Sequence, residues 1–153
     1  MALLEAPAEQ AFAHLDDFAA LSAHMEKRSA MMIGSRMRIA TDGLGGRAVG
    51  SRVRMEGCVL GMTLRLEEVV TERQPPVRKA WETVEAKLVA IGQYRLGFEL
   101  SPRGERSVLR VFIDYDLPPW VPTRWLGGLL ASAYARWCTA RMTADAVRHF
   151  RSK

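Results

Sequence analysis

The longest helix-forming segment of this chain is residues 122–150, which read PTRWLGGLLASAYARWCTARMTADAVRHF. At about 100° per residue, a helix over this segment collects apolar side chains within a sector of roughly 100°, the width that a core-facing helix needs. These side chains are Leu126, Leu129, Leu130, Ala133, Trp137, Ala140, Ala144 and Val147. The segment therefore predicts one long C-terminal helix that packs through this stripe.

Before this helix in the chain, apolar residues recur at every second position, as in a β-strand. Between Ile33 and Leu117, apolar and polar residues alternate in runs that end at turn residues such as Ser101-Pro102-Arg103-Gly104. The runs are expected at about residues 33–39, 49–59, 61–73, 77–86, 88–100 and 107–117, with a short first strand at 2–5. Because the connections are short, neighbouring strands should be antiparallel. The sequence thus predicts a sheet of six to seven strands.

Two short helices are expected between the first strand and the rest of the sheet. Pro7 stands at a favourable first position for a helix that ends near Leu15. Asp16 and Asp17 then offer a cap for a second helix from Phe18 to Met25. The order of elements is strand, two short helices, strands and long helix, which is an α+β arrangement.

The size and the cysteines indicate a domain that needs no cross-link. At 17.1 kDa, residues 1–153 are expected to form one domain with a core of ordinary size. Cys58 and Cys138 have no Cys or His at ligand spacing, and the three histidines fit no HExxH pattern. The cysteines are interpreted as buried reduced thiols, and neither a metal site nor a cofactor is expected.

The formal charge of +5 raises nucleic acid or anionic lipid as a partner. The arginines are scattered over nearly every predicted element and acidic residues lie between them, so nucleic acid is not the expected partner. The longest uncharged apolar run, about residues 126–135, is too short to span a bilayer. Met1 to Ala6 lack the pattern of a secretory signal. A cytoplasmic location is therefore expected, and a homodimer is left open.

Several short motifs resemble a known superfamily over nearly the whole chain. They are Ala6-Pro7-Ala8-Glu9-Gln10-Ala11-Phe12, Val49-Gly50-Ser51, residues 68–76 (EVVTERQPP), Trp81-Glu82-Thr83 and the helix end from Trp137 to Phe150. In their order, they resemble the helix-grip fold of the START-like superfamily, which includes polyketide cyclase/dehydrase-like and birch-pollen-allergen-like proteins. The resemblance implies an antiparallel sheet wrapped around the C-terminal helix.

The same resemblance implies a cavity between sheet and helix for a small hydrophobic or amphipathic molecule. The expected function is binding or transport of that molecule, and the alternative is an enzyme of the polyketide cyclase, aromatase or dehydratase type. The residues expected to contact the ligand are Met55, Leu66, Glu68, Trp81, Tyr94, Phe98, Tyr115, Leu130, Tyr134 and Trp137. Core packing alone would explain the apolar members, and no catalytic residue is assigned.

Glu68 is the main polar candidate. It continues the alternation of Leu64 and Leu66, which turns its carboxylate toward the apolar face, where an ionised group needs a partner. There it would orient a ligand, act as a general base, or pair with Arg141 on the helix. Alternatively, a β-bulge at Glu67-Glu68 would return Glu68 to solvent. The sequence leaves these interpretations open.

Two glycines, Gly127 and Gly128, interrupt the strong helix-forming pattern at its start, at roughly 1 kcal/mol each relative to alanine. They would allow either close packing against the sheet or a bend over a ligand entrance. Arg95 and Asp114 have the side chains that a cyclase would use. Both fall on the outward side of their strands, and no role is assigned to them.

Overall fold

The computed structural model describes residues 1–18, 37–59, 62–87, 93–116 and 124–151. Within these ranges the elements are β1 (Ala2–Leu4), α1 (Ala8–Leu15), β2 (Met37–Thr41), β3 (Arg52–Val59), β4 (Met62–Gln74), β5 (Arg78–Lys87), β6 (Tyr94–Arg103), β7 (Arg106–Tyr115) and α3 (Arg124–Arg151). The predicted α+β helix-grip arrangement is confirmed. The second short helix, expected from Phe18 to Met25, falls outside the described residues after Phe18.

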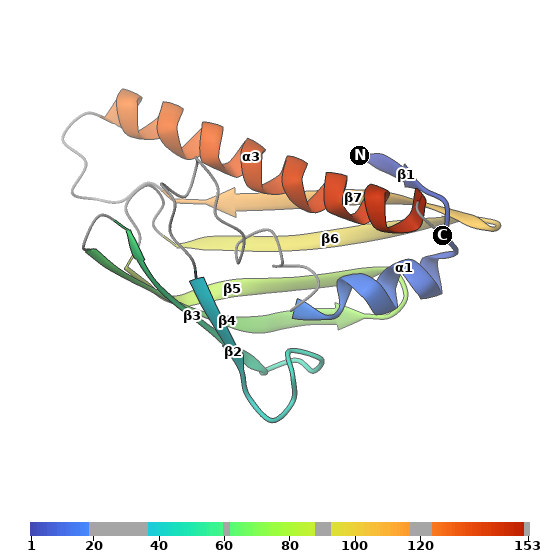
Figure 1. Ribbon diagram of the computed structural model, residues 1–153, viewed down its shortest axis with the longest axis horizontal. Helices are drawn as coiled ribbons and strands as arrows, with labels where there is room; N and C mark the ends of the chain where they lie inside the picture. The colour runs from blue at the N-terminus through green and yellow to red at the C-terminus, as the bar shows by residue number, and fades with distance from the viewer. Residues whose placement is uncertain (19–36, 60–61, 88–92, 117–123, 152–153) are drawn as a thin grey trace.

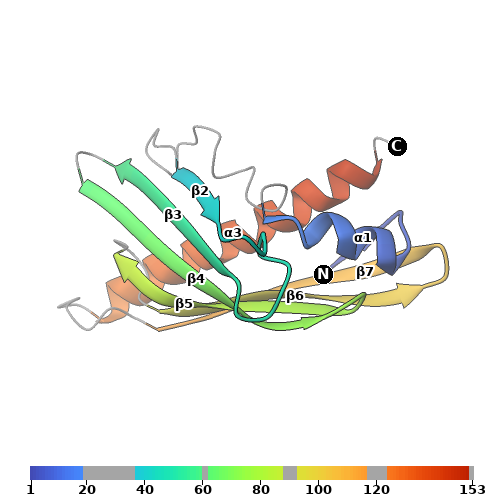
Figure 2. The same ribbon diagram turned by 90° about the horizontal axis from the view of Figure 1, so that it is seen from below.

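The seven strands form one antiparallel sheet in the order β1-β7-β6-β5-β4-β3-β2. Strands β2 to β4 bend away from the plane of β5 to β7, so the sheet is strongly curved (Figure 2). Helices α1 and α3 both lie on the concave side, and α3 runs along the sheet with its C-terminal end beside α1 (Figures 1 and 2). This geometry follows from short hairpin connections, which hold consecutive strands side by side.

The core lies where α1 and the C-terminal part of α3 meet the concave face. Its buried side chains include Phe12, Leu15, Leu66, Trp81, Phe98, Leu100, Leu109, Met142 and Phe150. Inward and outward residues alternate along β6 as predicted, because Phe98 and Leu100 are buried and Glu99 binds arginines on the outer face. Each such side chain contributes about 1.5–3 kcal/mol when it is removed from water.

The buried face of α3 differs from the predicted stripe. The buried residues are Ala131, Ala135, Cys138, Met142, Ala146 and Phe150, which recur at spacings of three and four. Ala133, Ala140 and Ala144 of the predicted stripe are exposed, while Trp137 and Val147 are half-buried. The prediction was wrong for these alanines because it followed the leucines at the start of the helix, whose side chains lie outside the described residues. Between residues 131 and 138, the buried residues of the helix are the small Ala131, Ala135 and Cys138.

Two irregularities interrupt the pairing of β4 with β5. Glu67 pairs with Glu85 and Glu68 pairs with Thr83, so Val84 is an extra residue on β5. The extra residue lies on the partner strand, and β4 keeps its alternation through Glu68. The irregularity expected at Glu67-Glu68 is therefore present, but it does not return Glu68 to solvent, because Glu68 is 1% exposed.

The second irregularity makes Thr71 an extra residue on β4 and changes which side chains of this strand face inward. After it, Arg73 pairs with Lys79, and both reach Asp16 at the end of α1. The Lys79 ammonium is fully buried, with Nζ 2.7 Å from Oδ1 and 2.8 Å from the carbonyl oxygen of Asp16. Arg73 Nη2 lies 2.8 Å from Asp16 Oδ2. This ionic cluster ties the end of α1 to the centre of the sheet.

Candidate functional site

Glu68 is the deepest carboxyl group on the concave face. Its residue is 1% exposed, and Val53 and Thr83 are its neighbours on the adjacent strands. The hydroxyl of Tyr94, on β6, donates a hydrogen bond to Oε1. No residue of the described ranges hydrogen-bonds Oε2. One oxygen of a fully buried carboxyl group is therefore left without a partner there.

Burial raises the pKa of Glu68 to about 7, while the hydroxyl of Tyr94 and the nearby indole N–H of Trp81 act in the opposite direction. Burial dominates because it disfavours the charged form of an acid. Arg141, which the sequence suggested as an ionic partner of Glu68, is exposed on α3. The prediction of an ion pair between Glu68 and Arg141 is therefore wrong. Glu68 therefore changes its charge near neutral pH, with no cation of the described residues to hold it ionised.

Helix α3 brings Tyr134 and Cys138 to the same region, one turn apart. Burial raises the pKa of the Cys138 thiol to about 11, and the neighbouring Tyr134 hydroxyl acts in the opposite direction. Burial also raises the pKa of Tyr134, and the charges of Cys138 and Glu68 raise it further. The pKa of Tyr94 is raised by burial and then by Glu68. We call Glu68, Tyr94, Tyr134 and Cys138 the inner polar cluster.

The chemistry open to this cluster follows from its protonation states. At neutral pH the two phenols and the thiol keep their protons, so Cys138 is a poor nucleophile. Glu68 is the member that exchanges a proton near pH 7. The cluster therefore offers hydrogen bonds and one exchangeable proton, with no activated nucleophile. Elsewhere in the described chain, no three His, Cys, Asp or Glu side chains gather as metal ligands.

The predicted site residues fall into three groups. Met55, Leu66, Trp81 and Phe98 are buried in the core. Glu68, Tyr94 and Tyr134 belong to the inner polar cluster, and the ring of Trp137 lies 6.0 Å from that of Tyr134. Tyr115 lines a pocket described below, and the side chain of Leu130 lies outside the described residues. Contact of any of them with a ligand stays a prediction.

Sequence reasoning missed Cys138 and Thr83 as members of the site. Cys138 follows Tyr134 by four residues, which is the helical spacing that stacks two side chains on one face. Thr83 is harder to place from sequence, because the extra residue Val84 changes the alternation of β5 immediately after it.

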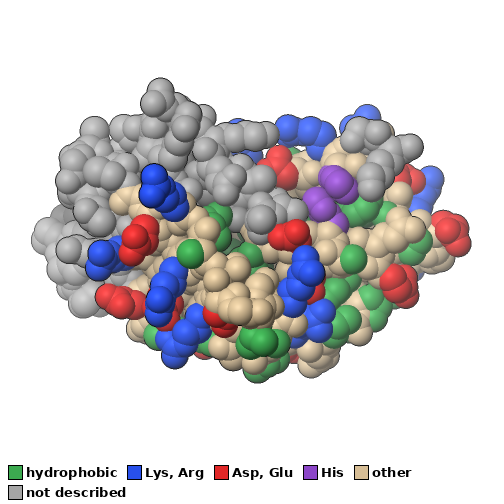
Figure 3. Space-filling view, turned by 60° about the horizontal axis from the view of Figure 1, so that its bottom comes forward, with side chains coloured by type: hydrophobic (Ala, Val, Ile, Leu, Met, Phe, Trp, Pro, Cys, Tyr) green, Lys and Arg blue, Asp and Glu red, His purple; other side chains and the backbone are tan. Residues whose placement is uncertain are grey.

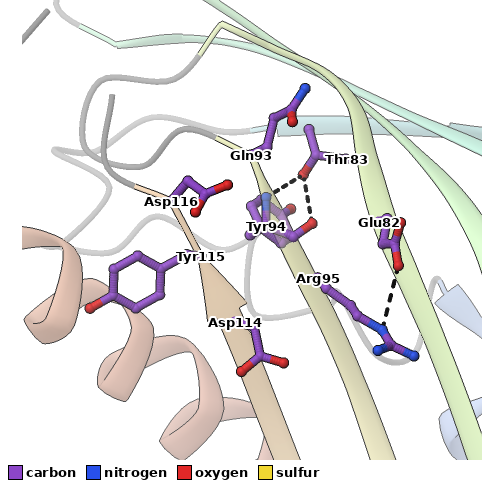
Figure 4. Close-up of a pocket in the computed structure, with 8 residues that line it drawn as sticks. All are labelled: Glu82, Thr83, Gln93, Tyr94, Arg95, Asp114, Tyr115 and Asp116. Atoms are coloured by element: carbon purple, nitrogen blue, oxygen red, sulfur yellow. Dashed lines mark hydrogen bonds and ion pairs between the residues drawn. The ribbon is translucent and has the colours of Figure 1, made fainter. Parts of the chain in front are cut away.

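An open pocket of about 310 Å³ lies where β5 and β6 separate. Backbone pairing of the two strands ends at Glu82 and Arg95. Beyond this pair, the side chain of Thr83 replaces the backbone hydrogen bonds between the strands. Its hydroxyl accepts a hydrogen bond from the Tyr94 N–H at 3.3 Å and donates one to the Tyr94 carbonyl oxygen at 3.2 Å (Figure 4). The residues around the pocket are Glu82, Thr83, Gln93, Tyr94, Arg95, Asp114, Tyr115 and Asp116. We call it the strand-end pocket.

Acidic groups outnumber basic ones in the strand-end pocket. Arg95 Nε lies 3.5 Å from Glu82, and Arg95 Nη2 lies 3.2 Å from Glu72. Asp114 and Asp116 are exposed, and no ion pair is found for either within the described chain (Figure 4). Over the face in Figure 3, basic and acidic side chains are interspersed, with no large area of one sign. The pocket is therefore a local negative site on a chain of net charge +5.

Residues 2–151 match the family model described as polyketide cyclase / dehydrase and lipid transport. The chain belongs to this family. No individually curated protein matches its sequence. Membership of the family agrees with the helix-grip fold and with polar groups placed beneath its long helix.

Solved structures of the same fold have low sequence identity to this member of the family. The Zhui aromatase/cyclase of a Streptomyces species is 15% identical with a TM-score of 0.70, over 98% of this chain and 90% of its own. Ara h 8.0201 is 8% identical with a TM-score of 0.67, over 99% and 95%. A START superfamily protein from Mycobacterium smegmatis is 16% identical with a TM-score of 0.61, over 97% and 94%. These similarities establish the fold, and within the described residues no helix is long and apolar enough to cross a membrane.

Proposed function

We propose that this protein binds a small hydrophobic or amphipathic molecule between its curved sheet and α3. The observation that carries the proposal is the inner polar cluster, in which Glu68 is fully buried and keeps one oxygen without a partner in the described chain. Ligand sites are mostly apolar, with a few polar groups that orient the ligand. The apolar residues of the concave face supply the first element and the cluster supplies the second.

The energetic argument is that a purely structural core gains nothing from such a group. A buried polar atom without a hydrogen bond costs about 1–3 kcal/mol. An apolar residue at position 68 would avoid that cost and pack against Val53 and Trp81. A ligand atom that hydrogen-bonds Oε2 would remove this cost. The carboxyl group would then stabilise the complex with the ligand.

A second candidate function is catalysis of the cyclase, aromatase or dehydratase type in the same space. The observation that favours it is the Glu68 pKa of about 7. A group of this pKa takes and returns protons efficiently near neutral pH. Glu68 would move the proton, and Tyr94 would hold the carboxyl group in place through its hydrogen bond to Oε1.

The binding proposal is tested by native mass spectrometry of the freshly purified protein, together with titration of lipophilic molecules that carry different polar heads. Bound molecules at one per chain, and quenching of tryptophan fluorescence on titration, are the expected results. A folded protein that binds no molecule of any head group would disprove the proposal. A cytoplasmic location, a single domain and a homodimer stay predictions beside it.

A further inference from the structure

The carboxyl group of Glu68 lacks a positive partner. Buried carboxylates are normally paired with a cation or held by several hydrogen bonds, because their charge is costly away from water. Glu68 has the Tyr94 hydroxyl on Oε1 and the Trp81 indole nearby, and no described Lys or Arg pairs with it. The buried ammonium of Lys79, on the neighbouring strand β5, is already bound to Asp16. A cation that pairs with Glu68 would therefore have to come from outside the described chain.

The strand-end pocket shares part of its wall with the surroundings of Glu68. Two of its wall residues, Thr83 and Tyr94, are the cross-strand neighbour of Glu68 and its hydrogen-bond donor. The extra residue Val84 lies opposite Glu67 and Glu68, and strand bulges of this kind bend the strand that carries them. The separation of β5 from β6 and the burial of Glu68 thus occur at the same place in the sheet.

The pocket also has the charge that would attract a cation. Glu82 is bound to Arg95, and Asp114 and Asp116 add two carboxylates that no described cation pairs. A negative opening in a positively charged protein raises the local concentration of cationic molecules and steers them toward it. This observation is independent of the buried group behind the wall.

We propose that the ligand is a lipophilic amine, which enters through the strand-end pocket and pairs its ammonium group with Oε2 of Glu68. The inference rests on the proposed binding function and names its ligand class. An aliphatic amine keeps its proton in contact with this acid, because amines titrate near pH 10. The ammonium group supplies the missing charge and a hydrogen bond to the open oxygen, while the apolar chain lies among the core residues of the concave face.

Other head groups fit this site less well. A fatty carboxylate would place a second negative charge beside Glu68 and would be repelled by the pocket. A ketone would accept a hydrogen bond only from the neutral form of Glu68, so its binding would weaken as pH rises. An amine has the opposite dependence, because it needs Glu68 ionised. The direction of the pH dependence therefore separates the two modes.

The test is calorimetric titration of the wild-type protein with dodecylamine, dodecanol, methyl undecyl ketone and dodecanoate at pH 6 and pH 8. Dodecylamine should bind at least about tenfold more tightly than dodecanol at pH 8, as a charge pair worth about 1.4 kcal/mol requires. Its affinity should rise on the order of tenfold from pH 6 to pH 8 as Glu68 ionises. Equal affinity for all four molecules, or a preference for the ketone at low pH, would overturn the amine proposal while leaving the binding function intact. Absence of binding by all four would reject the function itself.

Substitutions test which residues cause the preference for the amine. Glu68→Gln should lose the amine preference and its pH dependence but keep its affinity for dodecanol. Glu85→Gln, which removes an exposed carboxylate from the same strand pair, should behave as wild type. Asp114→Asn combined with Asp116→Asn should slow the association of dodecylamine several-fold at low salt, and this difference should shrink as salt is added. An unchanged amine preference in Glu68→Gln would contradict the pairing, and the wild-type pH dependence tests it even if that variant does not fold.

Discussion

The hydroxyl of Tyr94 reaches across β5 to donate a hydrogen bond to the carboxyl group of Glu68, which joins two strands that are not neighbours in the sheet. The bond holds Oε1 and leaves Oε2 without a partner in the described chain. A fixed carboxyl group is useful for recognition because its orientation is set before a ligand arrives. The same bond makes the protonation of Glu68 measurable through the stability of the fold.

The free energy of unfolding should fall by roughly 3 kcal/mol between pH 4.5 and pH 7 through Glu68 alone. The folded pKa of Glu68 is raised from 4.5 to about 7, so the folded state binds more protons than the unfolded state in this window and loses stability as pH rises. Glu68→Gln should remove this loss. It should therefore be more stable than wild type at pH 8 and similar at pH 4.5. Urea unfolding of both proteins across this range measures it, with Glu85→Gln as the control. Parallel curves for wild type and Glu68→Gln would contradict the pKa.

Tyr94→Phe should raise the pKa of Glu68, because it removes the hydrogen bond that favours the ionised carboxyl group. It should destabilise the fold by about 1–3 kcal/mol, with the larger loss at pH 8, where Glu68 is ionised. Carbon NMR of the Glu68 carboxyl group measures the titration directly. The matched control is Tyr115→Phe. Tyr115 is the cross-strand neighbour of Tyr94 on β7, and its substitution should leave the Glu68 titration unchanged.

Asp16→Asn should destabilise the protein by roughly 3–5 kcal/mol, because it leaves the buried Lys79 ammonium without its counter-charge. Burial would raise the pKa of Asp16, but hydrogen bonds and charges of Arg73 and Lys79 outweigh it and hold the pKa below 3.8. The stabilisation is therefore present above that pH and is lost as pH falls through the folded pKa. Thermal unfolding at pH 7 measures the effect.

The neighbouring variant Asp17→Asn is the control, since Asp17 and Arg47 lie 3.6 Å apart with side chains 44% and 60% exposed. Its removal should change stability by less than about 1 kcal/mol. The double variant Asp16→Leu with Lys79→Met should be less destabilised than Asp16→Asn, because both charges leave together. Equal destabilisation by Asp16→Asn and Asp17→Asn would show that the buried pair has no special weight.

Gly97→Ala should destabilise the sheet by about 1–3 kcal/mol or more. A Cβ at this position would lie 2.6 Å from the Lys79 carbonyl oxygen and 2.5 Å from Cζ of Phe112. The ring can move, but the carbonyl belongs to the paired strand β5. Gly43→Ala, where no atom lies within 4 Å of the added methyl, should change the unfolding free energy by less than about 0.5 kcal/mol. Similar melting temperatures for the two variants would argue against the close strand contact.

Strand alternation was sufficient to predict the inward position of Glu68 and Tyr94, since period two depends only on local sequence. It could not locate the extra residue Val84, because a bulge adds one residue without a distinctive side chain. The bond between Tyr94 and Glu68 depends on that register and on β5 lying between the two strands. The sequence also did not predict the ionic cluster of Asp16 and Lys79. The two residues are 63 positions apart, and lysine is usually found at the surface.

For helix α3, the sequence predicted the element but not the face that is buried. Its existence and approximate length followed from its composition, but the buried face did not. Alanine has little hydrophobicity to mark the inner side, and the leucines near its start favoured another face. The face that packs is decided by how closely a helix approaches the sheet, which is a property of both partners.

The inner residues of α3 change in size along the helix. Ala131, Ala135 and Cys138 are small, whereas Met142 and Phe150 belong to the main core with Phe12 and Trp81. Large side chains near α1 secure the fold, whereas in the proposed binding site the small residues at positions 131, 135 and 138 would set the room for a ligand. Exchanges at positions 131, 135 and 138 would then alter the proposed binding site without touching the large side chains that secure the fold.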